Sequence, residues 1–158
     1  METKNCIFCQ IVDKKMPAHV IWEDETHLAF LSIFPNTKGF TVVIPKKHCE
    51  SYAFAQSDQV LTSLIIATKK VANILDNYFE DVGRTGMFFE GYGVDHLHSK
   101  LFPMHGTGDM KKWANIESEE TDQFFELYPG YLCSNSSHRA ADEQLINLAR
   151  EIRKSYQD

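Results

Sequence analysis

Long apolar runs are missing from this sequence, because none approaches the roughly 18 to 20 residues that a helix needs to cross a bilayer. The first residues, METKNCIFCQ, are polar before they become apolar, which is not the pattern of a signal peptide. Internal repeats, low-complexity tracts and linker-like stretches of proline, serine and glycine are also missing. With 158 residues, 43% of them hydrophobic, the chain can bury one compact core. We therefore expect a single cytoplasmic domain over residues 1–158 with no membrane association.

Positive charge is in deficit, with 16 lysine and arginine residues against 22 aspartate and glutamate residues. The formal net charge of -6 argues against a general nucleic-acid or membrane-surface binder, because phosphate groups attract clustered basic side chains. An anionic ligand must therefore be held by a local site that works against the overall charge.

Hydrophobic patterning predicts five strands and two helices. Two short β-rich runs flank an acidic turn, as in a hairpin, and a β-branched run that stops at a proline follows them. Apolar residues at helical spacing behind the N-cap residue Ser57 predict a long amphipathic helix. Because two helices are too few to connect parallel strands, the pattern favours an α+β fold with an antiparallel sheet. The expected strands lie within residues 20–31, 40–45, 86–93 and 96–103, and the expected helices within 57–79 and 142–156.

The stretch VDHLHSKLFPMHG places His96, His98 and Lys100 at every second position. Alternate side chains of a strand share a face, about 6 to 7 Å apart, so these three should project together. A mostly neutral imidazole, with an unperturbed pKa of about 6.5, can attack phosphorus without a separate base. A neighbouring lysine would offset charge on phosphate oxygen atoms. A solvated polar strand face would give the same pattern, so the spacing alone leaves both interpretations open.

Cys6 and Cys9 form a C-x-x-C pair, which places two thiolates within reach of one tetrahedral ion. Zinc would need two further ligands, such as histidines. A redox pair is one alternative, but it is expected after a strand in a βαβ unit, and no predicted strand precedes Cys6. Unligated thiols are another alternative, because the cytosol keeps cysteines reduced.

The sequence HLHSKLFP resembles the signature of the histidine-triad (HIT) family of nucleotide hydrolases and transferases, in which three histidines alternate with apolar residues before a proline. It keeps the first two histidines and has Lys100 in the third place. The stretch from Cys6 to His48 is similar to the N-terminal half of the family, including its hairpin, its FP and KG turn and its VIPKKH strand end. The resemblance covers residues 1–108, so residues 109–158 are expected to be a variable C-terminal extension that carries a helix.

The resemblance implies a five-stranded antiparallel sheet with one long helix and a C-terminal helix, built as a homodimer. Family members bind a nucleoside phosphate with its base and ribose in an apolar cleft. By this correspondence His98 attacks the α-phosphorus, and water or another acceptor resolves the nucleotidyl-histidine. Phe8, Ile11 and Ile33 would lie near the nucleoside, although ordinary core residues would look the same. The alternative is a zinc-stabilised nucleotide-binding protein with little turnover.

The resemblance also implies a set of metal ligands. In several bacterial members a zinc ion is held by the N-terminal cysteine pair, by the histidine of PKKH and by the first histidine of the triad. These positions are Cys6, Cys9, His48 and His96. Four protein ligands leave no open coordination position, so the zinc ion would be structural.

The sequence departs from the family around the phosphate. Ser32 and Phe40 replace an aspartate and a histidine, and the loop FFEGYGVD is shorter than its counterpart. Lys100, with an unperturbed pKa near 10.4, is a slow proton donor at about pH 7, yet its charge can stabilise a departing phosphate. We expect backbone N–H groups near Gly91 and Gly93, together with Lys100, to meet the phosphate.

Overall fold

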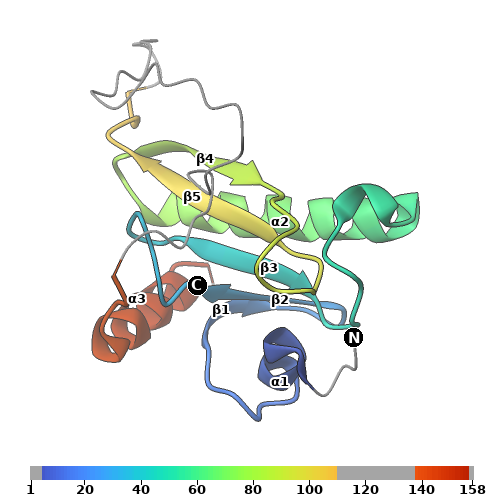
Figure 1. Ribbon diagram of the computed structural model, residues 1–158. Coiled ribbons are helices and arrows are strands. Elements are labelled where there is room, and N and C mark those ends of the chain that lie inside the picture. Colours follow the sequence, from blue (N-terminus) through green and yellow to red (C-terminus); the bar gives the residue numbers. More distant parts are fainter. Residues whose placement is uncertain (1–4, 110–137, 157–158) are drawn as a thin grey trace, which may run out of the picture.

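The computed structural model describes residues 5–109 and 138–156, and a five-stranded antiparallel sheet forms its centre (Figure 1). The strands lie across the sheet in the order β1-β2-β3-β5-β4. β1 and β2 form the predicted hairpin, and β3 pairs with β2. The expected α+β fold with an antiparallel sheet is therefore confirmed. The strands are β1 His19–Glu23, β2 His27–Leu31, β3 Thr41–Pro45, β4 Val82–Phe88 and β5 Ser99–His105.

Both predicted helices are present in the described residues. The hydroxyl group of Ser57 caps α2 by accepting a hydrogen bond from the backbone N–H of Val60. The last turn of α3 holds Arg153 and Lys154, whose positive charge suits the negative end of the helix dipole. α1 and the short 3-10 helix η2 were not predicted, because elements this short show no clear periodicity. The helices are α1 Ile7–Val12, η2 Ala53–Ala55, α2 Asp58–Tyr78 and α3 Asp142–Lys154.

The two faces of the sheet carry separate hydrophobic clusters, because successive strand residues point to opposite sides. One cluster joins Ala29 of β2 and Val43 of β3 to buried residues of α2 and α3. The other cluster packs against Phe8 and Ile11 of α1, and its buried members are Leu28, Phe30, Val42 and Ile44. Figure 1 shows α2 running across the sheet behind it. The helix α1 therefore covers the sheet face opposite to α2.

The outer edge of β1 is covered by α3. The guanidinium group of Arg153 donates a hydrogen bond to the carbonyl oxygen of Val20. The hydroxyl group of Tyr156 donates a hydrogen bond of 2.7 Å to the carbonyl oxygen of Ile21. These side chains satisfy acceptors at the edge of the sheet and fix α3 against it. The strand β4 forms the opposite edge of the described sheet.

The strand β5 begins at Ser99, three residues after the predicted start, so His96 and His98 precede it. Its pairing with β3 ends where Val43 lies opposite Ser99. Beyond this point Pro45 has no backbone N–H to offer, and its carbonyl oxygen instead accepts a hydrogen bond from the His96 ring. The strand is therefore shorter than the alternating pattern suggested.

The strand β4 spans Val82–Phe88, whereas the sequence predicted a strand within 86–93. Gly91 and Gly93, which follow β4, have positive φ angles of 68° and 84° and so cannot extend it. Most of the expected C-terminal extension lies outside the described residues, which resume at residue 138. No described helix is both long enough and apolar enough to span a membrane.

Candidate functional site

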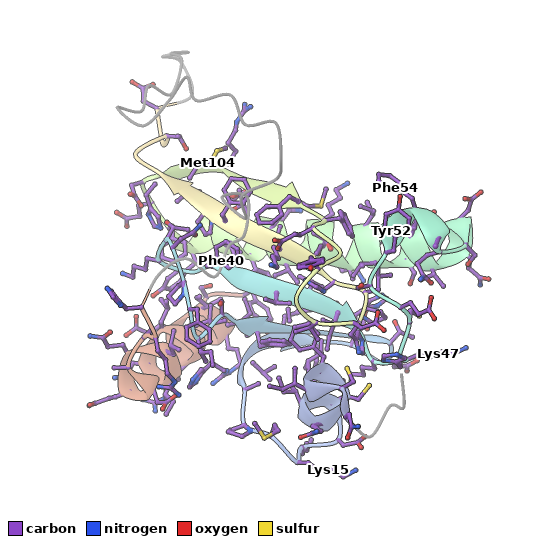
Figure 2. The ribbon with its side chains drawn as sticks, viewed as in Figure 1. Lys15, Phe40, Lys47, Tyr52, Phe54 and Met104 are labelled. Atoms are coloured by element: carbon purple, nitrogen blue, oxygen red, sulfur yellow. The ribbon has the colours of Figure 1, made fainter. Side chains whose placement is uncertain are left out.

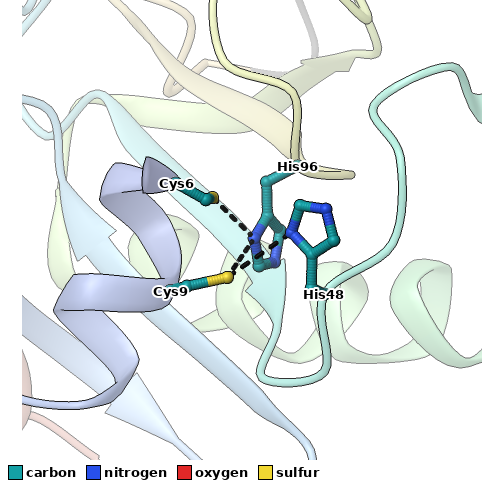
Figure 3. Close-up of side chains that lie close together, drawn as sticks. All are labelled: Cys6, Cys9, His48 and His96. Carbon is teal, nitrogen blue, oxygen red and sulfur yellow. Dashed lines mark hydrogen bonds between the residues drawn. The ribbon is translucent and has the colours of Figure 1, made fainter. Parts of the chain in front are cut away.

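Four potential metal ligands converge between α1, the segment after β3 and the segment before β5 (Figure 3). Cys6 is the N-cap residue of α1 and Cys9 follows it by one turn, so their thiol groups share a side of the helix. His48 and His96 come from the two other segments. The four ligand atoms all lie within 4.8 Å of one another. The structure therefore brings together every residue that the sequence predicted as a metal ligand.

The distances between these atoms suit a tetrahedral ion. Zinc–sulfur and zinc–nitrogen bonds of about 2.3 and 2.1 Å imply a sulfur-to-nitrogen separation of about 3.6 Å at a tetrahedral angle. Sγ of Cys6 lies 3.3 Å from Nδ1 of His96. Sγ of Cys9 lies 3.4 Å from Nδ1 of His48 and 3.6 Å from Nδ1 of His96. Two thiols and two imidazoles are also a donor set that zinc accepts, so these residues fit a zinc ion.

The contacts around the cluster determine the orientation and the protonation of its ligand atoms. Nε2 of His96 donates a hydrogen bond to the carbonyl oxygen of Pro45 at 2.8 Å, which leaves the lone pair on Nδ1, the atom that faces the thiols. Burial lowers the pKa of His96 and so favours the neutral ring. Burial and the neighbouring Cys6 raise the pKa of the Cys9 thiol to about 11. A bound cation would displace this thiol proton, because the thiolate is the form that binds metals.

His98 lies directly beside this cluster and is 2% exposed. Its Nδ1–H donates a hydrogen bond of 2.6 Å to the backbone carbonyl oxygen of His96, so the lone pair resides on Nε2. Burial lowers the pKa of His98, the nearby Lys100 ammonium group acts in the same direction, and the neutral imidazole is favoured. The ring of Phe8 meets the His98 ring edge to face, with centroids 5.4 Å apart. His98 is thus a buried, oriented and neutral imidazole.

Lys100 is buried and forms an ion pair with Glu90. Its ammonium group also lies 5.7 Å from the centre of the Phe88 ring. Lys100 points to the sheet face that α1 covers, whereas the Ser99 hydroxyl group contacts Thr68 of α2 at 2.6 Å. The alternation predicted for this segment therefore extends into β5.

A cavity of about 380 Å³ lies between α1, the turn after β2 and residues 92–94, and we call it the α1 cavity. Most of its lining is apolar. Five residues with a predicted role line it, namely Phe8, Ile11, Ile33, Gly93 and Lys100. Gly91 is not part of the wall, and its carbonyl oxygen accepts a hydrogen bond from the Ser51 hydroxyl group at 3.0 Å. His98 is also not part of the wall, but it contacts Phe8, which is.

Three polar residues in the wall of the α1 cavity were missed by the sequence reasoning. They are His19 at the start of β1, Arg139 in the segment before α3, and Asp142, the first residue of α3. No spacing pattern could have found them, because more than 100 residues separate His19 from Arg139 and only the packing of α3 against β1 brings them together.

The residues that depart from the HIT pattern also have defined places. Ser32 is buried, and its hydroxyl oxygen accepts a hydrogen bond from the backbone N–H of Phe34 at 3.1 Å. Phe40 is 1% exposed and packs edge to face against Phe88. An apolar contact therefore occupies the position where the family has a histidine.

Comparison with known proteins identifies the family. The family described as HIT domain matches residues 13–107 of this chain. An uncharacterised HIT-like protein of Methanocaldococcus jannaschii is 34% identical over 133 residues, which cover 79% of this chain and 99% of that protein. The chain therefore belongs to the HIT family.

Two further proteins are similar to this chain in sequence or in fold. The adenosine 5′-monophosphoramidase of Schizosaccharomyces pombe is 35% identical over 103 residues, which cover 63% of this chain and 74% of that enzyme. A zinc-bound histidine triad family protein from Mycobacterium smegmatis has the same fold, with a TM-score of 0.68 and 20% identity over 98% of this chain and 94% of that chain.

Proposed function

We propose that this protein is a nucleotide-binding hydrolase or nucleotidyl transferase that acts on a nucleoside phosphate ester, anhydride or phosphoramidate through a covalent bond to His98. The observation that carries the proposal is the state of His98, a neutral imidazole whose Nδ1–H is fixed by the His96 carbonyl group. Lys100, two positions further along, lies in the wall of the apolar α1 cavity. Similarity to the phosphoramidase of Schizosaccharomyces pombe also supports it.

The chemistry follows from the free lone pair of His98. Nε2 bonds to the α-phosphorus while the bond from phosphorus to the leaving group breaks, and the leaving group departs with the electron pair. The positive charge that develops on the ring is stabilised by the hydrogen bond from Nδ1–H to the His96 carbonyl oxygen. Water or another acceptor then bonds to phosphorus and releases a proton to solvent, while the electron pair of the phosphorus–nitrogen bond returns to Nε2.

Lys100 supplies positive charge to the phosphate and the leaving group in this proposal. Its ion pair with Glu90 holds the ammonium group in place within the wall. Phe8, Ile11 and Ile33 would contact the nucleoside, with the backbone of Gly93 near the phosphate. A phosphate contact by Gly91 stays a prediction, since this residue lies outside the cavity wall.

We also propose that Cys6, Cys9, His48 and His96 hold a structural zinc ion. The support comes from the sulfur-to-nitrogen distances of 3.3 to 3.6 Å, from the hydrogen bond that orients His96, and from the zinc-bound relative of Mycobacterium smegmatis. A bound zinc ion would tie α1 to the segments after β3 and before β5. With four protein ligands it would have no open position for a substrate.

One observation favours the alternative of a zinc-stabilised nucleotide-binding protein with little turnover. His98 is 2% exposed and does not line the α1 cavity, whereas Phe8, which packs against its ring, does. A substrate panel separates the two functions. Nucleoside phosphoramidates, dinucleoside polyphosphates and nucleotide esters are assayed with the wild type and with His98→Ala. Turnover that is lost in His98→Ala supports the enzyme, and binding without any turnover supports the alternative.

We further propose a cytoplasmic homodimer of single-domain chains, built through β4. This strand is an edge of the described sheet, and an exposed edge strand readily pairs with another chain. Met87 of β4 and Ile66 of α2 are exposed apolar side chains. Tyr52 and Phe54 also project outward before α2 (Figure 2), and Phe54 is 87% exposed. Exposed apolar side chains of this kind mark interaction surfaces.

A further inference from the structure

A carboxylate group stands in the wall of the α1 cavity at the start of α3. Asp142 lines the cavity together with His19 and Arg139. Nε2 of His19 lies 3.0 Å from Oδ1 of Asp142. The guanidinium group of Arg139 donates hydrogen bonds of 3.1 and 3.0 Å to Oδ1 and Oδ2. Among the described residues that line the cavity, Asp142 is the only one with a carboxylate group.

The position of Asp142 is fixed by the packing of α3. Leu145, Ala149 and Ile152 of this helix are buried in the core cluster. Just before the helix, the backbone N–H of Ala140 donates a hydrogen bond of 2.9 Å to the carbonyl oxygen of Ile33, another residue of the cavity wall. The carboxylate group is therefore held in the wall of the cavity.

Asp142 retains the capacity to bind a ligand. A carboxylate group offers about four lone-pair sites, and the three contacts from His19 and Arg139 leave one on Oδ2. The side chain is 56% exposed, so a ligand can reach it. Hydrogen bonds from Arg139 and His19 keep the pKa of Asp142 below its usual range, so it accepts hydrogen bonds and does not donate them. Ligand hydroxyl groups are donors that match this site.

We propose that Asp142, held by His19 and Arg139, accepts a hydrogen bond from a ribose hydroxyl group and makes the α1 cavity selective for ribonucleotides. The inference rests on the proposed nucleotide function. In dinucleotide-binding folds, a carboxylate group accepts a hydrogen bond from a ribose hydroxyl group. The paired Arg139 balances the charge of Asp142, so the carboxylate does not repel a phosphate group in the same cavity.

The test compares the binding of AMP, GMP, CMP and UMP with that of their 2′-deoxy and 3′-deoxy forms by calorimetry. The full-length wild type should bind the best ribonucleotide about 3- to 10-fold more tightly than at least one of its deoxy forms. Asp142→Ala should weaken the binding of the ribonucleotide but not of that deoxy form, so that the ratio of their Kd values falls towards one. Asp142→Asn, which keeps the side-chain volume, should reduce the ratio in the same direction.

Glu143→Gln is the matched control, because it removes a charge from the same helical turn and Glu143 does not line the cavity. It should keep the wild-type ratio. The inference is overturned if the ratio is equal in Asp142→Ala and Glu143→Gln, or if the wild type binds both sugars equally. If no nucleotide of any sugar binds, the proposed nucleotide function fails together with the inference. Equal binding of both sugars contradicts only the inference.

Discussion

His96 contacts two neighbours at once, because its ring faces the thiol of Cys6 and its backbone carbonyl group accepts a hydrogen bond from His98. Nδ1 of His96 lies 3.3 Å from Sγ of Cys6, and its carbonyl oxygen accepts the Nδ1–H of His98 at 2.6 Å. Any change that moves His96 therefore also moves the hydrogen bond that orients His98. The candidate metal centre and the candidate nucleophile are linked through one residue.

Zinc content and stability should depend on the two N-terminal thiols. The double variant Cys6→Ser with Cys9→Ser should lose the metal, whereas Cys49→Ser should keep it, since Cys49 is outside the cluster. Free zinc at about 1,000 times its Kd stabilises a protein by about 4 kcal/mol, or roughly 10 °C in Tm for a chain of this size. Metal analysis after dialysis measures the first effect, and thermal unfolding at this concentration of free zinc measures the second. Equal zinc content in the double variant and the wild type would show that the site is wrong.

The pH dependence of activity should reflect the buried state of His98. The neutral ring is the nucleophile, and burial lowers its pKa, so the ring stays neutral below the ordinary value of about 6.5. The kcat/KM value should therefore be flat from about pH 8 to pH 6.5 and fall only at lower pH. Lys100→Met removes a nearby positive charge and should shift this fall to higher pH. A midpoint above pH 6.5 in the wild type contradicts the expectation.

The contributions of Lys100 and Glu90 to the free energy of unfolding should be coupled, because the two residues form a buried ion pair. Breaking a buried pair by Glu90→Gln leaves the ammonium group uncompensated and should cost about 3 kcal/mol in the free energy of unfolding. Adding Lys100→Met should recover much of this loss, because no buried charge then remains. Glu23→Gln, which removes the acid of the more exposed pair with Lys46, is the control and should change stability little. A double-mutant cycle by urea unfolding measures the coupling, and a coupling energy near zero would refute it.

The edge strand β4 should mediate dimer formation. Light scattering coupled to gel filtration should give twice the mass of one chain. Met87→Lys places a charge on the exposed edge and should shift the population towards the monomer. Ile146→Lys makes the same change at an exposed position of α3 and should leave the dimer intact. If the wild type has the mass of one chain at all concentrations, the proposal of a dimer is wrong.

The sequence predicts those features that depend on short-range periodicity. The helical spacing after Ser57 predicted α2, and the alternation predicted from His96 to Lys100 continues into β5, where Ser99 contacts α2 and Lys100 lines the α1 cavity. The C-x-x-C spacing and the resemblance to the HIT family together indicated all four members of the candidate metal cluster. These features could be predicted because local geometry or a known pattern determines them.

The features that the sequence did not predict depend on tertiary packing. The position of Asp142 in the α1 cavity results from the packing of α3 on β1, which lies more than 100 residues earlier. The late start of β5 results from Pro45, whose carbonyl oxygen binds the His96 ring. A phosphate contact was expected from the backbone N–H groups near Gly91, and this stays a prediction, whereas the contact of Gly91 with Ser51 is visible only in the folded chain.

The most direct measurement is the intact mass of the protein after brief reaction with a nucleoside phosphoramidate, recorded without acid treatment. The wild type should gain the mass of one nucleotidyl group, and peptide mapping should locate it on His98. His98→Ala should gain nothing under the same conditions. A substrate that is turned over with no adduct in the wild type, or with an adduct that persists in His98→Ala, would contradict the covalent role of this imidazole.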